Sequence, residues 1–407
     1  MYYNEIMKLL INFLLLLALI IGGLWGYLSF TYPDTPTQQT ALYFVEHLAR
    51  PHEKLTKNVL GFLPYWKVED KDTVQLTALT DVNYFGLTVN STGEIIQLMG
   101  NQTDPGFREW NTQAMRDFVT KAHIMGTKVS ASIICQDNTA IEALLNNTDA
   151  QEKLIGQIDE QISTRKLDGI NIDFEYLGEP DTAYQQRFTE LSKRLSTRLK
   201  AKHPNLQLTL SIMPRSARDQ DLFDFAKLVP LYDAFIGMSY DYYGATADVA
   251  GPGAPMKGYK EGKYFFDVTT TYADYRKFIP KEKIIMGVPY YGWDRTVTDQ
   301  DKLMSTTYAA DHANNYSAII SYSRMKKENF KQTYTCIWEP VAQETWCSYT
   351  DPQTKLPHQV WLSDEKSIGI RFAFAKQQQF QGIAIWNLGY DTGYNDLYSL
   401  ITKTFSN

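Results

Sequence analysis

The sequence predicts an α/β fold, namely a (β/α)8 TIM barrel with a small α+β insertion after its seventh strand and a transmembrane helix ahead of it. Short apolar or β-branched runs recur along the chain, segments with helical periodicity separate most of them, and a long run without charged side chains stands near the N-terminus. The expected divisions are a membrane segment at 1–30, a linker at 31–56 and a barrel domain at 57–407, with the insertion at about 294–360.

The N-terminal run covers residues 9–30, and such a run is long enough to cross a bilayer. It ends in bulky residues such as Trp25 and Tyr27 rather than in a small-residue cleavage site, so we favour an uncleaved anchor over a cleaved signal peptide. Lys8 is the only basic side chain close to either end of the run, which places the N-terminus in the cytoplasm. The rest of the chain is then periplasmic or extracellular and membrane-anchored, or secreted if the N-terminus is cleaved.

The runs that predict the barrel strands number eight. They cover residues 59–66, 82–89, 128–135, 169–177, 206–213, 234–243, 283–293 and 382–388. Alternation of strands with helices indicates a parallel sheet, because parallel neighbours need crossover connections. The strands are almost continuously apolar, which favours a closed barrel covered on both faces. An open, doubly wound sheet is the alternative, but no glycine-rich turn follows the first strand.

The insertion is indicated by a long interval between the seventh run and the next helical stretch. This interval holds the short aromatic runs TYTCIWEP, ETWCSYT and HQVWL, which suggest a small antiparallel subdomain. Loops that follow barrel strands lie on the active-site face, so the insertion is expected to form one wall of a groove. Cys336 and Cys347 flank a predicted hairpin, where a disulfide and two free thiols are equally compatible with the sequence.

Composition excludes some classes of partner. The net charge is −6 without clusters of Lys or Arg, so nucleic acid is not an expected partner. The six His and three Cys form no pattern of metal ligands, and we expect neither a metal nor a cofactor. Aromatic residues reach 14%, with 27 Tyr, a surplus that suits stacking on sugars, although core packing is the alternative for any single ring.

The fourth predicted strand carries two carboxylates on one face. Strand alternation in LDGINIDFEYL places Asn171, Asp173 and Glu175 together, opposite Ile170, Ile172 and Phe174. The α-carbons of the two acids are then about 6.6 Å apart, and so close a pair inside a barrel cannot easily ionise together. One acid keeps its proton near neutral pH, as a general acid must in order to protonate a departing glycosidic oxygen. Glu175, nearest the barrel mouth, is the candidate; the alternative is that both are surface or helix-capping acids.

These residues resemble glycoside hydrolase family 18, whose fourth strand carries the motif DGxDxDxE. Here the motif reads from Asp168 to Glu175. MSYDYYG at 238–244, GVPYYGW at 287–293 and GIAIWNLGYD at 382–391 are similar to the sixth, seventh and eighth strands of that family. The resemblance covers roughly residues 58–400, most of the expected barrel.

The resemblance implies a retaining, substrate-assisted hydrolysis of β-1,4 bonds next to N-acetylglucosamine. Glu175 would act as acid and then as base, Asp173 would orient the acetamido group that attacks the anomeric carbon, and Tyr240 would hold its oxygen. Asp241 would assist, although alternation places it opposite Tyr240, so the strand must twist or end there. The residues implied to line the sugar site are Trp386 as its floor, Met238, Tyr291, Phe85 and Met213, with core packing an equal alternative for Tyr291 and Phe85.

One position departs from the family motif, because its middle aspartate is Asn171 here. An amide cannot carry the charge that helps Asp173 to change orientation, so slower turnover or a shifted pH optimum is our hypothesis. Related sequences with Asn at this place are, as the resemblance implies, often cell-wall or spore-associated glucosaminidases of bacteria.

The main alternative to an enzyme is a non-catalytic, chitooligosaccharide-binding lectin on the same barrel. Retention of Glu175, Asp173 and Tyr240 favours the enzyme. A scaffold for protein partners has no sequence feature in its support. Chitin, chitooligosaccharides, peptidoglycan and N-glycan cores all offer the required acetamido group, and the sequence leaves the choice among them open. We expect a monomer that meets a glycan and, through its N-terminal helix, a membrane.

Overall fold

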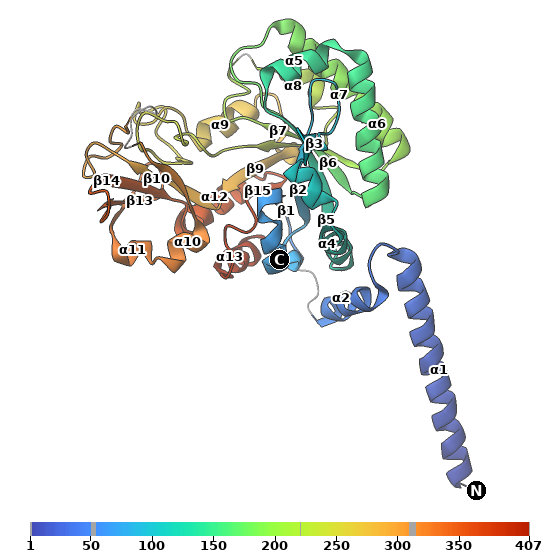
Figure 1. The fold of residues 1–407 in the computed structure, drawn as a ribbon. Helices are drawn as coiled ribbons and strands as arrows, with labels where there is room; N and C mark the ends of the chain where they lie inside the picture. The colour runs from blue at the N-terminus through green and yellow to red at the C-terminus, as the bar shows by residue number, and fades with distance from the viewer. Residues whose placement is uncertain (1, 50–53, 220, 309–314, 407) are drawn as a thin grey trace.

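The computed structural model describes residues 2–49, 54–219, 221–308 and 315–406, with side chains from Asn12 onward. Its centre is a closed barrel of parallel strands in the order β1-β15-β9-β8-β7-β6-β5-β2 (Figure 1). These strands are β1 (Asn58–Pro64), β2 (Asp81–Thr88), β5 (Lys128–Cys135), β6 (Gly169–Phe174), β7 (Gln207–Ile212), β8 (Ala234–Gly237), β9 (Ile284–Pro289) and β15 (Gly382–Trp386). The predicted TIM barrel is confirmed.

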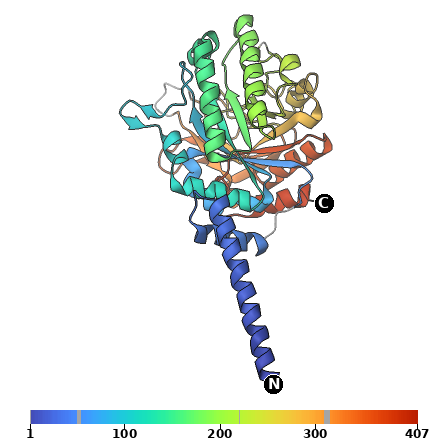
Figure 2. The ribbon, with the colours of Figure 1, turned by 90° about the vertical axis from the view of Figure 1, so that its right-hand side faces the viewer.

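Helices surround this barrel (Figures 1 and 2). They are α3 (Pro105–Trp110), α4 (Gln113–Ile124), α5 (Asn138–Asn146), α6 (Thr148–Arg165), α7 (Thr182–Lys202), α8 (Phe225–Leu228), α9 (Val268–Tyr275), α12 (Glu365–Gln377) and α13 (Asp396–Phe405). Short 3-10 helices cover Tyr65–Thr73, Leu76–Ala78 and Lys281–Lys283. Polar residues begin most of the α-helices. Thr112, Asn147 and Asp181, for example, each accept a hydrogen bond from a backbone N–H of the first turn, which would otherwise have no partner.

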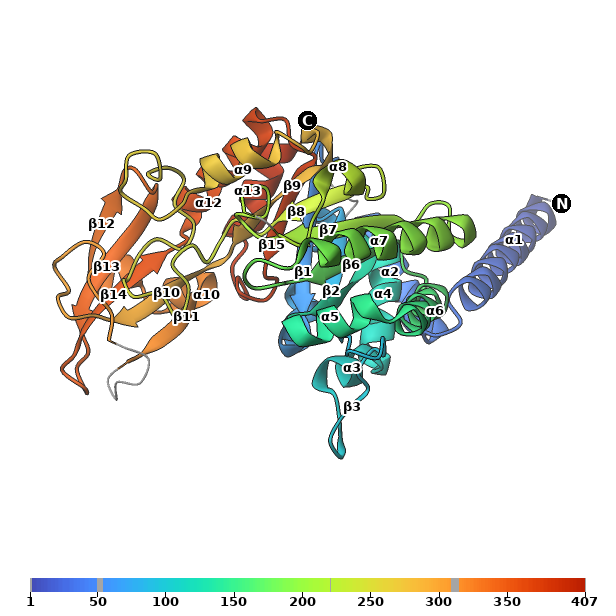
Figure 3. The same cartoon turned by 90° about the horizontal axis from the view of Figure 1, so that it is seen from above.

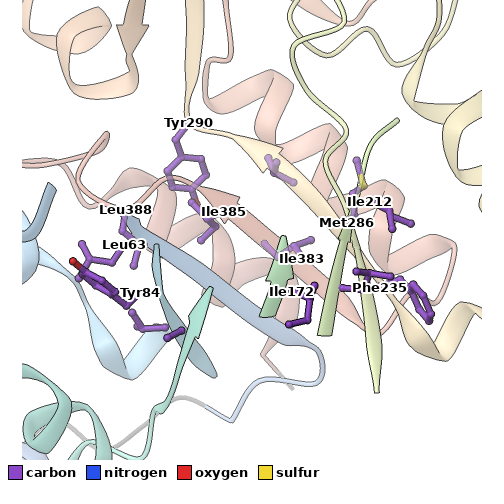
Figure 4. Close-up of a cluster of buried hydrophobic side chains, with 14 of the residues drawn as sticks. Leu63, Tyr84, Ile172, Ile212, Phe235, Met286, Tyr290, Ile383, Ile385 and Leu388 are labelled. Atoms are coloured by element: carbon purple, nitrogen blue, oxygen red, sulfur yellow. The ribbon is translucent and has the colours of Figure 1, made fainter. Parts of the chain in front are cut away.

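The barrel strands are buried on both faces, and this explains their apolar sequences. Side chains such as Leu63, Tyr84, Ile172 and Ile385 belong to one large cluster of buried residues (Figure 4). A second, smaller cluster fills the lumen with the alternate residues of the same strands. It comprises Leu60, Phe62, Phe85, Ile134, Ala234, Ile236, Ile285 and Ala384, with Trp386 packed against it. The lumen is thus a packed core that ends below the barrel mouth.

The predicted α+β insertion follows the seventh barrel strand. It is a five-stranded antiparallel sheet in the order β11-β10-β14-β13-β12. Its elements are β10 (Tyr291–Thr296), β11 (Ser317–Ser321), α10 (Tyr322–Lys327), α11 (Phe330–Thr333), β12 (Thr335–Glu339), β13 (Glu344–Thr350) and β14 (Pro357–Leu362). Cys336 and Cys347, which face each other across β12 and β13, form a disulfide, while Cys135 is free and buried. Figure 3 shows the sheet standing beside the barrel.

Three of the predicted strands end three or more residues earlier than the sequence suggested. The fourth ends at Phe174 and the sixth at Gly237, so the polar residues that follow them belong to loops. The seventh run divides at Tyr290, with β9 on one side and the first strand of the insertion on the other. Buried side chains continue past these strand ends, for example Tyr176 after β6 and Tyr242 after β8, so a hydrophobic pattern does not reveal the boundary.

The N-terminal region consists of two helices, α1 (Tyr2–Thr31) and α2 (Thr37–Ala49). Within α1, Asn12–Thr31 is long and apolar enough to cross a membrane. Helix α1 points away from the barrel domain, whereas α2 lies along the base of that domain (Figures 1 and 2). The expected linker therefore contains a helix. Its residues 50–53 and residues 309–314 of the insertion lie outside the described part of the chain.

Candidate active site

A cavity of about 410 Å³ opens at the carboxyl ends of the barrel strands. It is lined by Phe62, Tyr65, Trp66, Phe85, Gly86, Thr88, Ile134, Gln136, Asp173, Glu175, Ser211, Met238, Tyr240, Asp241 and Trp386. These residues come from the ends of six barrel strands, from the segments that follow them and from the loop after β8. The charged side chains in this lining are all carboxylates.

Asp173 lies within β6 and its side chain is almost wholly buried, at 3% exposure. Burial raises the pKa of Asp173 well above its usual range, and the neighbouring charge of Glu175 raises it further, against the opposing hydroxyl of Ser211. Its Oδ1 atom has no hydrogen-bond partner among the described residues. Asp173 is therefore held near the cavity as a carboxyl that resists ionisation.

Glu175 follows the end of β6, and its backbone N–H donates to the Cys135 carbonyl at 2.9 Å. Burial raises the pKa of Glu175; a hydrogen bond from Gln136 lowers it and the Asp241 carboxylate raises it. The Gln136 amide Nε2 donates to Glu175 Oε1 at 2.7 Å. The net direction is upward, so Glu175 retains its proton to higher pH than an exposed glutamate, as a general acid requires.

Asn171 lies below the cavity and is fully buried. Its Nδ2 donates to Thr209 Oγ1 at 3.1 Å and to Ser211 Oγ at 3.2 Å, while its Oδ1 accepts from Ser211 Oγ at 3.0 Å. Both ends of the amide are thus engaged in a neutral hydrogen-bond network of the lumen. Asn171 supports the floor under Asp173 without lining the cavity itself.

Tyr240 and Asp241 both line the cavity although they are neighbours in sequence. Strand β8 has already ended at Gly237, and Asp241 adopts φ of 57°, so the alternation of a strand no longer applies. Trp293 Nε1 from β10 donates to Asp241 Oδ1 at 2.8 Å. Gly287 makes room for this arrangement, because a Cβ there would stand 2.4 Å from the Gly237 carbonyl oxygen and 3.0 Å from the Tyr240 ring.

Aromatic rings form one wall of the cavity. The ring of Trp386 lies 4.8 Å from that of Phe85, 5.5 Å from Phe62 and 6.3 Å from Trp66, measured between centroids. Its plane is within 18° of the Tyr240 ring, at 6.3 Å. Such a group of rings offers apolar faces to the C–H face of a pyranose.

A second cavity of about 650 Å³ adjoins the first. The two share Glu175, Met238, Tyr240 and Asp241, so together they form a groove that passes over Glu175. The second cavity is also lined by Tyr176, Leu177, Gly178, Glu179, Met213, Pro214, Arg215, Ser216, Asp219, Asp221, Tyr242 and Phe265. A linear polymer could occupy both cavities with one of its linkages beside Glu175.

Of the predicted site residues, Glu175, Asp173, Tyr240, Asp241, Trp386, Met238, Phe85 and Met213 line the groove. Tyr291 and Asn171 lie behind it. The Tyr291 ring is 6.4 Å from that of Tyr240 and 6.0 Å from that of Trp293, so Tyr291 packs between barrel and insertion.

Sequence reasoning missed Gln136, Trp66 and Trp293. Gln136 directly follows the third predicted strand and Trp66 is the last residue of the first, and that position at a barrel mouth is the signal that pointed to Glu175. Trp293 gave no such signal, because its contact with Asp241 depends on the path of the insertion.

Comparison with known proteins places this geometry in a family. Residues 58–391 match the family described as glycosyl hydrolases family 18. The di-N-acetylchitobiase of Rattus norvegicus is 25% identical over 283 residues, covering 65% of this chain and 71% of the relative. The cortical fragment-lytic enzyme of Bacillus subtilis is 24% identical over 279 residues, covering 64% of this chain and 57% of the relative.

Solved structures show the same fold. The GH18 chitinase of Cycas revoluta, solved in complex with (GlcNAc)3, superposes with a TM-score of 0.71 at 16% identity, covering 85% of this chain and 99% of that one. Another Bacillus subtilis glycosylase is matched over only 53% of its length, so the chain spans about half of some relatives. Because the family match extends over most of the chain, from β1 to the loop after β15, the chain belongs to glycosyl hydrolases family 18.

Proposed function

We propose that the chain is a retaining glycosidase that cleaves the β-1,4 bond next to an N-acetylglucosamine residue of a chitooligosaccharide, with Glu175 as its acid and base. The observation that carries this proposal is the convergence of Asp173, Glu175, Tyr240 and Asp241 on one cavity beside Trp386. Solved relatives add support, since chitinases of this fold were solved with GlcNAc oligosaccharides.

Catalysis would proceed in two steps without an enzymic nucleophile. In the first, the acetamido oxygen of the bound sugar attacks its own anomeric carbon while Glu175 gives its proton to the departing glycosidic oxygen. Asp173 orients the acetamido group by accepting a hydrogen bond from its N–H, and Tyr240 donates to its oxygen. In the second step, the Glu175 carboxylate takes a proton from water, whose oxygen attacks the anomeric carbon and displaces the acetamido oxygen, so configuration is retained.

Charge favours a neutral sugar chain. Asp173, Glu175 and Asp241 are the charged residues of the first cavity. Arg215 is the one cation among the described lining residues of the second cavity, and both its Nε and its Nη2 bind Asp219, at 2.7 Å and 2.9 Å. A sugar carboxylate, such as the lactyl group of peptidoglycan, would therefore meet a groove without a free positive charge.

The test compares the full chain with Glu175→Gln on fluorogenic chitooligosaccharides, with partially digested peptidoglycan as the competing substrate. We expect release of fluorophore by the unaltered chain and a loss of about 10³-fold or more in Glu175→Gln. Binding without turnover by both proteins would support a lectin and refute the proposal. Turnover of peptidoglycan alone would keep Glu175 as the acid but refute the neutral substrate.

The setting of this activity is a separate part of the proposal. We propose that α1 anchors the chain in a membrane, that residues 31–56 connect it to the barrel domain at 57–407, and that the groove acts outside the cytoplasm. The support is the length and apolar composition of Asn12–Thr31. Alkaline extraction of membranes tests it, because an anchored chain stays in the pellet and a cleaved, secreted chain does not.

A further inference from the structure

Helix α2 exposes a stripe of aliphatic side chains on one face. Leu42, Val45 and Leu48 are 68%, 63% and 69% exposed, and their spacing of three residues places them on the same side of the helix. Gln38 and Ala49, also exposed, extend this side at either end without adding a charge. A single exposed leucine needs no explanation, but a continuous aliphatic stripe on one helix indicates a surface that something covers.

The opposite face of α2 packs on the barrel domain. Thr40 is fully buried. The Glu46 carboxylate pairs with Lys121 of α4 at 3.1 Å, and the same ammonium group lies 5.5 Å from the centre of the Tyr43 ring. These contacts fix the rotation of α2 about its axis. The aliphatic stripe therefore faces away from the domain.

The end of α1 also contacts the base of the domain. Lys166, which follows α6 just before β6 begins, donates from Nζ to the Thr31 carbonyl at 2.7 Å. Thr35 Oγ1 donates to Thr120 Oγ1 at 2.8 Å, and Gln113 Nε2 donates to the Asp34 carbonyl at 2.6 Å. The domain thus rests on the connection between the two helices.

This arrangement identifies what covers the stripe. The apolar segment Asn12–Thr31 ends where the domain begins, so a membrane crossed by α1 would have its surface at Thr31. Backbone hydrogen bonds from Tyr32 N to Leu28 O and from Thr35 N to Tyr32 O fold the connection into a turn, so α2 starts beside the end of α1. Figures 1 and 2 show α2 on the side of the domain from which α1 leaves.

We propose that α2 is an interfacial helix, which lies in the surface of the membrane that α1 crosses and inserts Leu42, Val45 and Leu48 among its acyl chains. An amphipathic helix binds a membrane surface in this way, with its apolar face at the boundary between headgroups and acyl chains and its polar face turned away from the lipid. Together, α1 through the membrane and α2 along it hold the base of the barrel against the lipid, with the groove at the opposite end.

The test uses a single labelled thiol in the full chain. Of the three native cysteines, Cys135 is buried and the other two form a disulfide, so an added cysteine is the accessible thiol. Leu42→Cys and Leu48→Cys, each carrying an environment-sensitive fluorophore, are reconstituted in liposomes with and without phospholipids that bear a nitroxide in the upper acyl chain. Met99→Cys is the matched control, since Met99 is an aliphatic side chain with 62% exposure on the β3–β4 hairpin (Leu98–Met99, Gln102–Thr103) after β2.

We expect the nitroxide to quench the fluorophores on α2 at least about twofold and to leave the Met99→Cys label unchanged. Adding Val45→Glu to Leu42→Cys is expected to reduce the quenching, because a charge would then enter the apolar layer. Quenching on α2 no greater than at Met99→Cys overturns the proposal. Blue-shifted emission that the nitroxide does not quench also overturns the proposal, since a protein surface then covers the stripe. A chain that fails to float with the liposomes overturns it as well.

Discussion

Gln136 donates a hydrogen bond of 2.7 Å from Nε2 to Glu175 Oε1, which links the loop after β5 to the carboxyl group beside the groove. The bond favours the charged form of Glu175 and opposes burial, which favours the neutral form. A glutamine amide can also turn its oxygen toward a protonated carboxyl, so it suits a group that gains and loses a proton. Asp173, Tyr240 and Asp241 also line the first cavity beside Glu175.

Replacement of Gln136 by Leu is expected to move the alkaline limb of kcat/KM to higher pH. Loss of the donated bond raises the pKa of Glu175, so the acid stays protonated to higher pH. The Glu175 carboxyl also loses the contact that orients it, which lowers kcat by about tenfold. Asn138→Ala is the control, because Asn138 begins α5 directly after this loop but binds the backbone of Leu177. An alkaline limb that does not move in Gln136→Leu, when measured over a full pH profile, would contradict the expectation.

Replacement of Asn171 by Asp is expected to destabilise the fold and to shift the pH optimum. The new carboxyl cannot donate to both Thr209 and Ser211, and it adds a second buried acid two residues from Asp173. Loss of buried donors costs about 1–3 kcal/mol. Thermal unfolding and the pH profile of turnover measure the two effects, with Asn171→Ala showing the loss of the donors alone. Unchanged stability together with an unchanged pH profile would show that Asn171 affects neither the stability of the fold nor the pH dependence of turnover.

The buried pair between Glu344 of β13 and Arg371 of α12 is expected to hold the insertion on the barrel. Both groups also bind Ala254, whose N–H donates to Glu344 at 3.0 Å and whose carbonyl accepts from Arg371. Arg371→Met leaves an unpaired buried carboxyl, which costs about 3–5 kcal/mol, whereas the double variant with Glu344→Leu is expected to lose less. A double-mutant cycle by thermal unfolding checks this, and additive losses would contradict it.

Asp391 is expected to make the fold less stable at alkaline pH. Burial raises the pKa of Asp391 to about 7, whereas an unfolded aspartate has a pKa of about 4. The folded state therefore binds the extra proton, and its stabilisation is complete below about pH 4 and is lost as pH rises through about 7. Asp391→Asn should flatten this decline, by on the order of 2 kcal/mol at about pH 8. Melting temperatures of both proteins, measured between about pH 5 and about pH 8, test this expectation. Parallel curves would show that Asp391 does not cause the decline in stability.

The barrel could be predicted because its strands are apolar on both faces and alternate with amphipathic helices. Ile170 and Ile172 pack toward the helices, while Asn171 and Asp173 face the lumen, as the period of two required. Strand ends were harder to place. Beyond Gly237, Tyr242 and Tyr243 are buried outside any strand, and a hydrophobic pattern does not distinguish a buried loop from a buried strand.

The site residues at the ends of barrel strands could be predicted from the sequence. Those that reach the site through the path of the insertion could not. Glu175 and Trp386 follow from motif and topology together. The contact of Trp293 with Asp241 joins residues far apart in sequence through a sheet whose direction no local pattern specifies. Tyr291 was expected in the lining for the same motif-based reason, yet it lies behind the lining, where its ring packs against those of Tyr240 and Trp293.

The hydrogen bond from Trp293 to Asp241 has a consequence for protein engineering. Trp293 belongs to β10, the first strand of the insertion, so a carboxylate of the groove has a hydrogen-bond donor from outside the barrel. A shortened chain that joins Pro289 to α12 would preserve the strands and helices of the barrel but remove a donor to a carboxylate of the groove. Grafting of foreign insertions onto this barrel would have to begin after Thr296 in order to retain that donor.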